Sequence, residues 1–236
     1  MRVLVLQHIV CEPPAEYEDV LRERGAEILR VELDEGEPLP DPGDFDAIVA
    51  MGGPMSANDD VDLPWLTQEK RLIGDCVRAD MPYWGACLGV QLLAASLGAQ
   101  VYPGPLPEVG LMNVDLAEAA IGDPVFRGLP PSLLTLQWHG DTFDLPEGSV
   151  RLAGSSAYPN QAFRWGDRAY GVQFHVEVTI DLARQWATVP AYGAYADRVL
   201  GPGALPRLLD EFGEHEGELR SHGRAMFSRW LDVATG

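Results

Sequence analysis

Basic residues are scarce in this sequence of 236 residues. Only 17 lysines and arginines stand against 36 aspartates and glutamates, which gives a formal net charge of −19. A surface this acidic repels the phosphates of nucleic acids and the headgroups of anionic membranes. We therefore expect no nucleic-acid partner and no membrane partner, and we attribute the charge to solubility.

Long apolar runs are also missing. No stretch approaches the roughly 20 apolar residues that a helix needs to span a bilayer. The apolar run within residues 1–8 is too short for a signal peptide and predicts a buried strand instead. A cytoplasmic location is the resulting expectation.

Cysteines and metal-binding patterns are few as well. The three cysteines, Cys11, Cys76 and Cys87, are too few for a disulfide scaffold and are expected to be reduced thiols. The Cys, His and Asp residues show no metal-ligand spacing. No phosphate-binding loop of the P-loop or dinucleotide type is present. The sequence thus predicts neither a metal site nor a cofactor.

What the chain does contain is a pattern of alternating strands and helices, with enough hydrophobic residues (46%) for a sizeable core. Strand-like runs lie at residues 2–7, 27–33, 45–51, 82–86, 133–138 and 170–174, and helix-like stretches lie at 15–24, 65–78 and 88–97. Strands such as Ala-Ile-Val-Ala at residues 47–50 are continuously apolar, which is typical of a sheet covered on both faces. The β-α order predicts an α/β fold with a doubly wound, mostly parallel sheet.

The middle of the chain, from about residue 100 to residue 166, has a different character. It is rich in Pro and Gly and carries short apolar runs at residues 150–153 and 161–165, which predict added antiparallel strands or hairpins. A helical pattern returns at residues 181–188, and residues 204–233 predict one or two surface helices. No long linker divides the chain, so we expect one domain over residues 1–236, with residues 189–236 as a helical C-terminal extension.

Cys87 lies between an apolar strand and a helix, in the sequence Gly-Ala-Cys-Leu-Gly-Val-Gln at residues 85–91. Glycines two positions before and after the cysteine are typical of a nucleophile elbow, a sharp strand-to-helix turn that strains the nucleophile's backbone. The helix N-terminus favours the thiolate, and the N–H of Leu88 points to where an oxyanion would form. The motif alone also fits a buried structural cysteine in a β-α turn.

His175 and Glu177 supply the other half of a catalytic group. They are separated by one residue near the end of an apolar strand, and such residues project to the same face of an extended chain. A carboxylate in that position can orient the imidazole and stabilise its charged form. A histidine at a strand end is often structural. Combined with an elbow cysteine, however, the pair completes a set of nucleophile, base and orienting group.

A third segment, Met-Gly-Gly-Pro-Met at residues 51–55, follows another buried strand. Its two glycines allow the backbone to approach a ligand closely, as they would in an ordinary turn. With Cys87 as nucleophile, the N–H of Gly53 becomes a candidate second oxyanion donor.

These motifs resemble those of the class I, triad-type glutamine amidotransferases, and the resemblance runs from the first strand to about residue 188. The stretch Gln-Trp-His-Gly-Asp-Thr-Phe at residues 137–143 also resembles a glutamine-pocket segment in relatives of the GMP synthetase amidotransferase domain. The resemblance implies a flavodoxin-like sheet. It also implies that Cys87 attacks the γ-carboxamide of glutamine, with Gly53 and Leu88 as the oxyanion hole. His175, oriented by Glu177, would then protonate the departing ammonia and activate water against a glutamyl thioester.

The resemblance also implies a set of residues that hold the glutamine: Gly52, Gln91, His139, Gly140 and Asp141. Gln91 lies one helical turn after the nucleophile, although a helix-surface role is the alternative. His139 is the best alternative base, but its setting fits pocket lining better because it lacks a carboxylate spaced along an extended strand.

Two positions differ from the family pattern. Val176 stands where many relatives have proline, which changes backbone stiffness but neither catalytic side chain. Leu111 stands where relatives often have tryptophan, and the loss of an aromatic near the pocket leaves open whether glutamine itself is the substrate.

Three functions are therefore compatible with the sequence. The first is an amidotransferase subunit that delivers ammonia to a separate synthetase, since the chain after residue 188 is too short for an acceptor-activating domain. The second is a stand-alone γ-glutamyl peptidase or hydrolase. The third is a non-catalytic regulatory or binding protein on the same fold, which the complete triad argues against.

Overall fold

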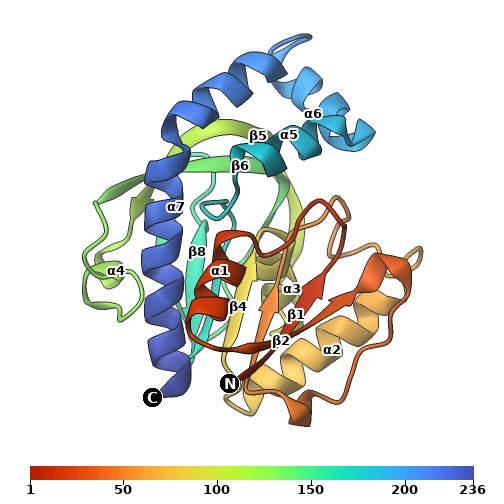
Figure 1. The fold of residues 1–236 in the computed structure, drawn as a ribbon, viewed down its shortest axis with the longest axis vertical. Coiled ribbons are helices and arrows are strands. Elements are labelled where there is room, and N and C mark those ends of the chain that lie inside the picture. The colour runs from red at the N-terminus through yellow and green to blue at the C-terminus, as the bar shows by residue number, and fades with distance from the viewer.

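The computed structural model describes residues 1–236 and is built around one sheet of nine strands (Figure 1). The strands are β1 (Arg2–Gln7), β2 (Glu27–Glu32), β3 (Ala47–Ala50), β4 (Tyr83–Ala86), β5 (Val101–Leu116), β6 (Ser132–Phe143), β7 (Ser149–Gly154), β8 (Ala162–Trp165) and β9 (Ala169–Val172). Their order across the sheet is β2-β1-β3-β4-β9-β8-β7-β5-β6.

The first five strands of that order are parallel. All residues of β3 and β4 are buried, as their continuously apolar sequences predict for strands covered on both faces. The carboxyl ends of these strands meet at one edge of the sheet, where ligands bind in such folds. The predicted fold class is confirmed.

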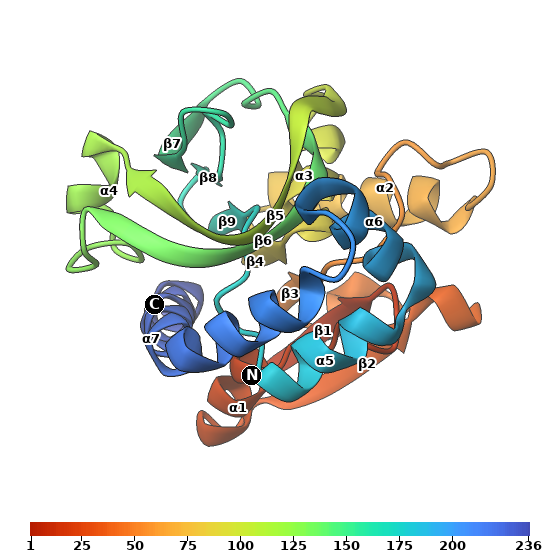
Figure 2. The same ribbon diagram turned by 90° about the horizontal axis from the view of Figure 1, so that it is seen from above.

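The other half of the sheet is antiparallel. β5 and β6 form a long, strongly curved ribbon that arches away from the parallel strands (Figure 2). At Leu136, β6 also pairs with His175, which follows β9, so the ribbon bends back toward the centre of the sheet. The antiparallel strands expected near residues 150–153 and 161–165 are present as β7 and β8. The 16-residue strand β5 was not predicted, because Pro103, Pro105 and Pro107 obscure it.

Helices cover both faces of the sheet (Figures 1 and 2). One face packs against α2 (Trp65–Arg78) and α3 (Leu88–Ser96), and the other packs against α1 (Glu16–Glu23), α5 (Ile180–Thr188) and α7 (Leu205–Thr235). A short helix, α4 (Glu118–Gly122), lies between β5 and β6 in the chain. α6 (Pro190–Leu200) falls in the extension expected to be helical over residues 189–236, although the sequence predicted no separate bounds for it. It begins with a proline at its first position, where the missing N–H has no intrahelical acceptor to lose.

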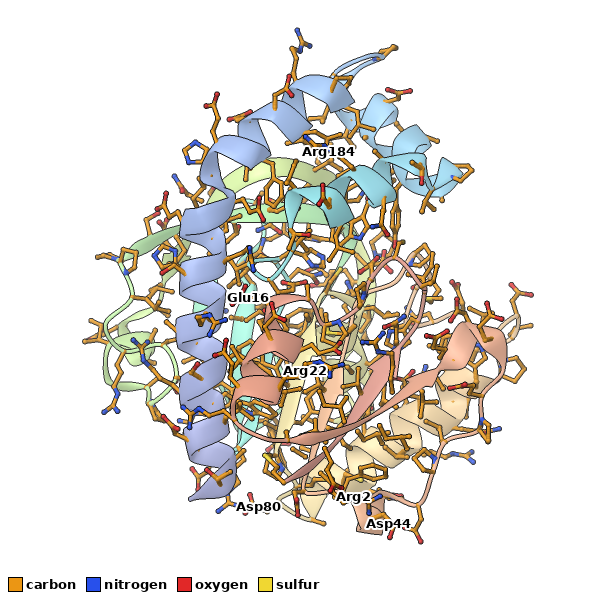
Figure 3. The ribbon with its side chains drawn as sticks, in the orientation of Figure 1. Arg2, Glu16, Arg22, Asp44, Asp80 and Arg184 are labelled. Carbon is orange, nitrogen blue, oxygen red and sulfur yellow. The ribbon has the colours of Figure 1, made fainter.

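The C-terminal helix α7 lies beside α1 along the sheet (Figure 1). Phe227 and Trp230 pack against Tyr17 of α1 and Trp84 of β4 in a buried aromatic cluster. At the edge of this contact, Glu16 accepts hydrogen bonds from Arg220 (2.7 Å) and Arg224 (2.6 Å), and Figure 3 shows Glu16 on the side of α1 that faces α7. The last segment is thus one long helix rather than two. None of the helices combines the length and the apolar character needed to cross a membrane.

Candidate active site

Cys87 occupies the turn between β4 and α3. Its backbone has φ 52° and ψ −106°, a combination that a non-glycine residue adopts only when the surroundings enforce it. A Cβ at Gly85 would lie 2.6 Å from the carbonyl of Gly89, and a Cβ at Gly89 would overlap the carbonyl oxygen of Ala50. Both flanking glycines are therefore required by the close packing of β4, α3 and β3. The turn has the elbow geometry expected from the sequence.

Two backbone N–H groups without an acceptor in the chain belong to residues near the cysteine. Leu88 is the first residue of α3, so its N–H has no intrahelical acceptor. The N–H of Gly53, in the loop after β3, also has no acceptor within the chain. Both residues line the same cavity as Cys87. The arrangement can stabilise negative charge at the cysteine and on an adjacent oxygen.

His175 and Glu177 form a buried pair. Nδ1 of His175 lies 2.7 Å from Oε1 of Glu177, and the second oxygen of Glu177 accepts a hydrogen bond from the N–H of Val176 at 2.9 Å. Burial lowers the pKa of His175, but the charge of Glu177 and the hydrogen bonds with Cys87 and Glu177 outweigh it and raise that pKa well above its ordinary value. His175 thus favours the imidazolium form beside Cys87.

The backbone that carries this pair differs in detail from the expectation. β9 ends at Val172, so His175 and Glu177 lie beyond the strand rather than at its end. Instead, His175 exchanges two backbone hydrogen bonds with Leu136 of β6, at 2.9 and 3.0 Å. The antiparallel ribbon therefore fixes the position of the imidazole.

Gln173 was not among the sequence candidates, yet it contacts Cys87. Its side-chain amide donates to Sγ of Cys87 at 3.6 Å, and its carbonyl accepts from the amide of Gln91 at 3.0 Å. Gln91 also lines the cavity. Gln173 lies two residues before His175, so on an extended chain it projects to the same face as His175 and Glu177, and this spacing could have identified it.

A cavity of about 270 Å³ opens beside Cys87. Its lining residues are Gly53, Pro54, Met55, Ser56, Cys87, Leu88, Gln91, Trp138, His139, Gly140, Asp141, Ala191, Tyr192 and Tyr195. Most of the residues proposed to hold a substrate are among them. Gly52 is an exception: it is not a lining residue, and a Cβ there would overlap Oε2 of Glu12 and lie 3.4 Å from Cε1 of His175. Leu111 is not a lining residue, so Trp138, Tyr192 and Tyr195 supply the aromatic surface.

Both ring nitrogens of His139 already have partners. Nδ1 lies 3.0 Å from the backbone oxygen of Asp141, and Nε2 lies 3.1 Å from Oε2 of Glu108. Glu108 pairs with His139 across β5 and β6, and Gln161 donates to the same Glu108 oxygen at 2.8 Å. This carboxylate comes from the neighbouring strand, where sequence spacing could not reveal it. A histidine engaged at both nitrogens fits pocket lining better than proton transfer.

Two further buried groups lie under the loop at residues 52–53. His8 bonds to the backbone oxygen of Gly52 through Nδ1 (3.1 Å) and to Glu69 through Nε2 (2.9 Å), so it holds the loop in place. Glu12, from the segment between β1 and α1, accepts a hydrogen bond from the hydroxyl of Tyr192 on α6. Burial raises the pKa of Glu12 above its ordinary value, and the charge of Glu177 adds to that effect.

Neither Glu12 nor Tyr192 was a sequence candidate, because no motif connects residues 180 positions apart. No group of three or more His, Cys, Asp or Glu side chains in the chain is arranged to hold a metal ion.

The family model described as "Glutamine amidotransferase class-I" matches residues 17–186. The chain belongs to the class-I glutamine amidotransferase family. It is 33% identical over 185 residues to the glutamine amidotransferase-like protein YfeJ of Salmonella typhimurium, covering 77% of each chain. It is also 34% identical over 143 residues to one of the subunits of the glutamine-hydrolysing GMP synthase of Ignicoccus hospitalis, covering 60% of this chain and 71% of that one.

Solved structures of glutamine amidotransferases share nearly the whole fold. One from Thermotoga maritima matches with a TM-score of 0.87 and 32% identity, covering 98% of both chains. Another from Methylobacillus flagellatus matches with a TM-score of 0.88 and 29% identity, covering 98% of this chain and 94% of that one. These family members therefore share the arrangement that includes α6 and α7, whereas the family model ends before α6 begins.

Proposed function

We propose that this glutamine amidotransferase hydrolyses the γ-carboxamide of glutamine through a Cys87-His175-Glu177 triad and a covalent glutamyl thioester. The observation that carries the proposal is the strained backbone of Cys87 beside a buried imidazole whose Nδ1 lies 2.7 Å from Glu177. The family of the chain supports the same chemistry.

In the first half of the reaction, the thiolate of Cys87 attacks the γ-carbonyl carbon of glutamine. The carbonyl oxygen becomes an oxyanion, which the N–H groups of Gly53 and Leu88 stabilise. His175, held as imidazolium by Glu177, donates its proton to the nitrogen, and the C–N bond breaks to release ammonia. A glutamyl thioester remains on Cys87.

In the second half, neutral His175 removes a proton from water, and the resulting hydroxide attacks the thioester carbonyl. The C–S bond breaks, glutamate leaves, and the thiolate-imidazolium pair is restored. Glu177 keeps Nδ1 of His175 protonated throughout, so that the other ring nitrogen exchanges the proton.

The cavity residues supply the remaining contacts of the proposed complex. Gln91, Gly140 and Asp141 line it within reach of a bound amino acid, and His139 provides a ring surface. The side chain of Asp141 is held by Ser56, whose hydroxyl donates to it at 2.8 Å. A Cβ at Gly52 would overlap Oε2 of the buried Glu12, so glycine at this position lets the oxyanion loop pack against that side chain.

Released ammonia needs an acceptor. Relatives from Ignicoccus hospitalis and Sulfolobus acidocaldarius are named as subunits of glutamine-hydrolysing GMP synthases, which supports a separate synthetase as partner of this chain. The competing function is stand-alone hydrolysis of γ-glutamyl peptides. A partner-dependent enzyme should be slow alone and accelerate with its synthetase, whereas a peptidase should be fast alone on peptides.

The test is to incubate wild type and Cys87→Ser with glutamine and with a γ-glutamyl dipeptide, and to measure glutamate and ammonia. Cys87-dependent release from glutamine supports the proposal, and release only from the dipeptide replaces it with γ-glutamyl hydrolysis. If neither turns over, an electrophilic glutamine analogue is added. Absence of labelling at Cys87 as well would overturn the proposal in favour of a binding protein.

A further inference from the structure

Helix α6 closes one side of the cavity, although it lies outside the residues that the family model matches. Three of its residues, Ala191, Tyr192 and Tyr195, line the cavity. Two of its side chains contact residues from other elements. The Tyr192 hydroxyl bonds to Glu12, and the Tyr195 hydroxyl lies so close to Gly140 that a Cβ there would overlap it.

The two tyrosines have different neighbours around the cavity. Tyr192 packs against Trp186 with ring centroids 6.1 Å apart, and Trp186 in turn packs edge-on against His175 at 4.8 Å. Tyr192 is therefore on the side of the catalytic imidazole. Tyr195 stands over Gly140 and under Arg198, whose guanidinium lies 4.6 Å from the ring centroid, on the side of Asp141.

In the proposed reaction, different parts of the substrate bind beside Tyr192 and beside Tyr195. The leaving nitrogen takes its proton from His175, so it must lie within hydrogen-bond reach of that ring. Any substituent on the γ nitrogen then extends into the imidazole side of the cavity, toward Tyr192. The α-amino and α-carboxylate groups of the glutamyl part occupy the remaining, Tyr195 side.

We infer that Tyr192 is a specificity-determining residue: its ring closes the leaving-group side, so the site takes the unsubstituted carboxamide of glutamine and excludes γ-glutamyl amides with a bulky nitrogen substituent. This inference rests on the proposed function and names its substrate class. The ring is 7% exposed and held between Trp138, Trp186 and Glu12, so it cannot swing aside without breaking buried contacts.

The experiment compares kcat/KM for glutamine, γ-glutamyl methylamide and γ-glutamyl benzylamide. The kcat/KM of wild type should fall steeply along this series. Tyr192→Ala should raise the benzylamide-to-glutamine ratio roughly tenfold or more, because a filled pocket discriminates by about that factor per small group. Tyr192→Phe keeps the ring and loses the bond to Glu12, so its ratio should stay at the wild-type value. Tyr195→Ala removes the same side-chain volume on the other side of the cavity, and it should change kcat/KM for all three substrates by the same factor.

Two results would overturn the inference: a wild type that cleaves the benzylamide as well as glutamine, or a folded Tyr192→Ala with an unchanged ratio. Tyr192→Leu replaces the alanine variant if that protein does not fold. If wild type turns over none of the three substrates, labelling of Cys87 by the electrophilic glutamine analogue decides the proposed function separately. The closure of the leaving-group side by Tyr192 is then tested by alkylating Cys87 with iodoacetamide and with its N-benzyl derivative. Tyr192→Ala must selectively accelerate alkylation by the larger reagent, or the inference is wrong.

Discussion

The side-chain amide of Gln173 donates a hydrogen bond to Sγ of Cys87 over 3.6 Å. Such a donor stabilises the thiolate and fixes its direction, and it is itself held by Gln91. Hydrogen bonds to charged groups contribute about 1.5–3 kcal/mol, and a sulfur acceptor lies toward the low end of that range. We therefore expect Gln173→Leu to slow alkylation of Cys87 by iodoacetamide roughly tenfold.

A comparison with Gln91→Leu separates this effect from general damage. That variant leaves the donor to Cys87 in place but removes its support, so its rate of labelling by iodoacetamide, which does not depend on the glutamine contacts of Gln91, should fall between those of wild type and Gln173→Leu. Unchanged labelling in Gln173→Leu would show that the contact with Sγ contributes nothing to reactivity.

Glu177 is expected to control the pH range of the reaction. Although burial lowers the pKa of His175, Glu177 and Cys87 raise it well above 6.5. Glu177→Gln removes the largest of these raising effects, so the imidazolium should lose its proton at lower pH and the alkaline fall of kcat/KM should move down the pH scale. The rate itself should drop roughly 10²–10⁴-fold, as when the carboxylate of a hydrolase triad is neutralised. The measurement is a pH profile of glutamine hydrolysis; a profile with the wild-type alkaline limb would contradict the assignment of Glu177.

The parts of the site that the sequence predicted are those encoded locally. The glycines around Cys87 and the spacing of His175 and Glu177 depend on neighbouring residues, so the elbow and the histidine-carboxylate pair could be recognised. Glu108 reaches His139 only because β5 pairs with β6, and Glu12 reaches Tyr192 only because α6 folds back over the sheet. No local pattern contains that information.

Secondary structure was likewise predicted correctly where it depends on neighbouring residues. α2 was predicted with its observed bounds, because its amphipathic pattern is uninterrupted. β5 was missed because three prolines interrupt its first half, and the register of its pairing with β6 shifts between Pro103 and Glu108. Such irregularity is tolerated there because a long partner strand restores the pairing after the shift.

Glu12 should make stability depend on pH in the opposite sense to an ordinary surface carboxylate. Burial raises its pKa above 4.5, and Glu177 adds to this, while His175, His8 and the Tyr192 hydroxyl partly oppose it. The folded chain thus holds the proton more tightly than the unfolded chain. Between pH 4.5 and the folded pKa, unfolding releases a proton, so the free energy of unfolding falls as pH rises.

Glu12→Gln should remove this contribution, because an amide still accepts from Tyr192 but does not ionise. We expect its free energy of unfolding, from urea titrations between pH 4.5 and 8, to decline less with pH than that of wild type. Glu23→Gln, at an exposed position on α1, serves as the control and should keep the wild-type decline. Parallel curves for wild type and Glu12→Gln would contradict a raised pKa at Glu12.

The requirement for glycine in the elbow can be tested by comparing Gly89 with a glycine elsewhere in the fold. A Cβ at Gly89 would overlap the carbonyl of Ala50, and neither backbone can move without displacing β3 or α3. Gly89→Ala should therefore lower the free energy of unfolding by about 3 kcal/mol, as overpacking against backbone does. Gly217 lies exposed within α7 with no atom near its missing Cβ, so Gly217→Ala should raise stability by about 0.5–1 kcal/mol through helix propensity. Denaturant unfolding of both variants measures the contrast. If Gly89→Ala were as stable as wild type, the close approach of α3 to β3 that positions Cys87 would not exist.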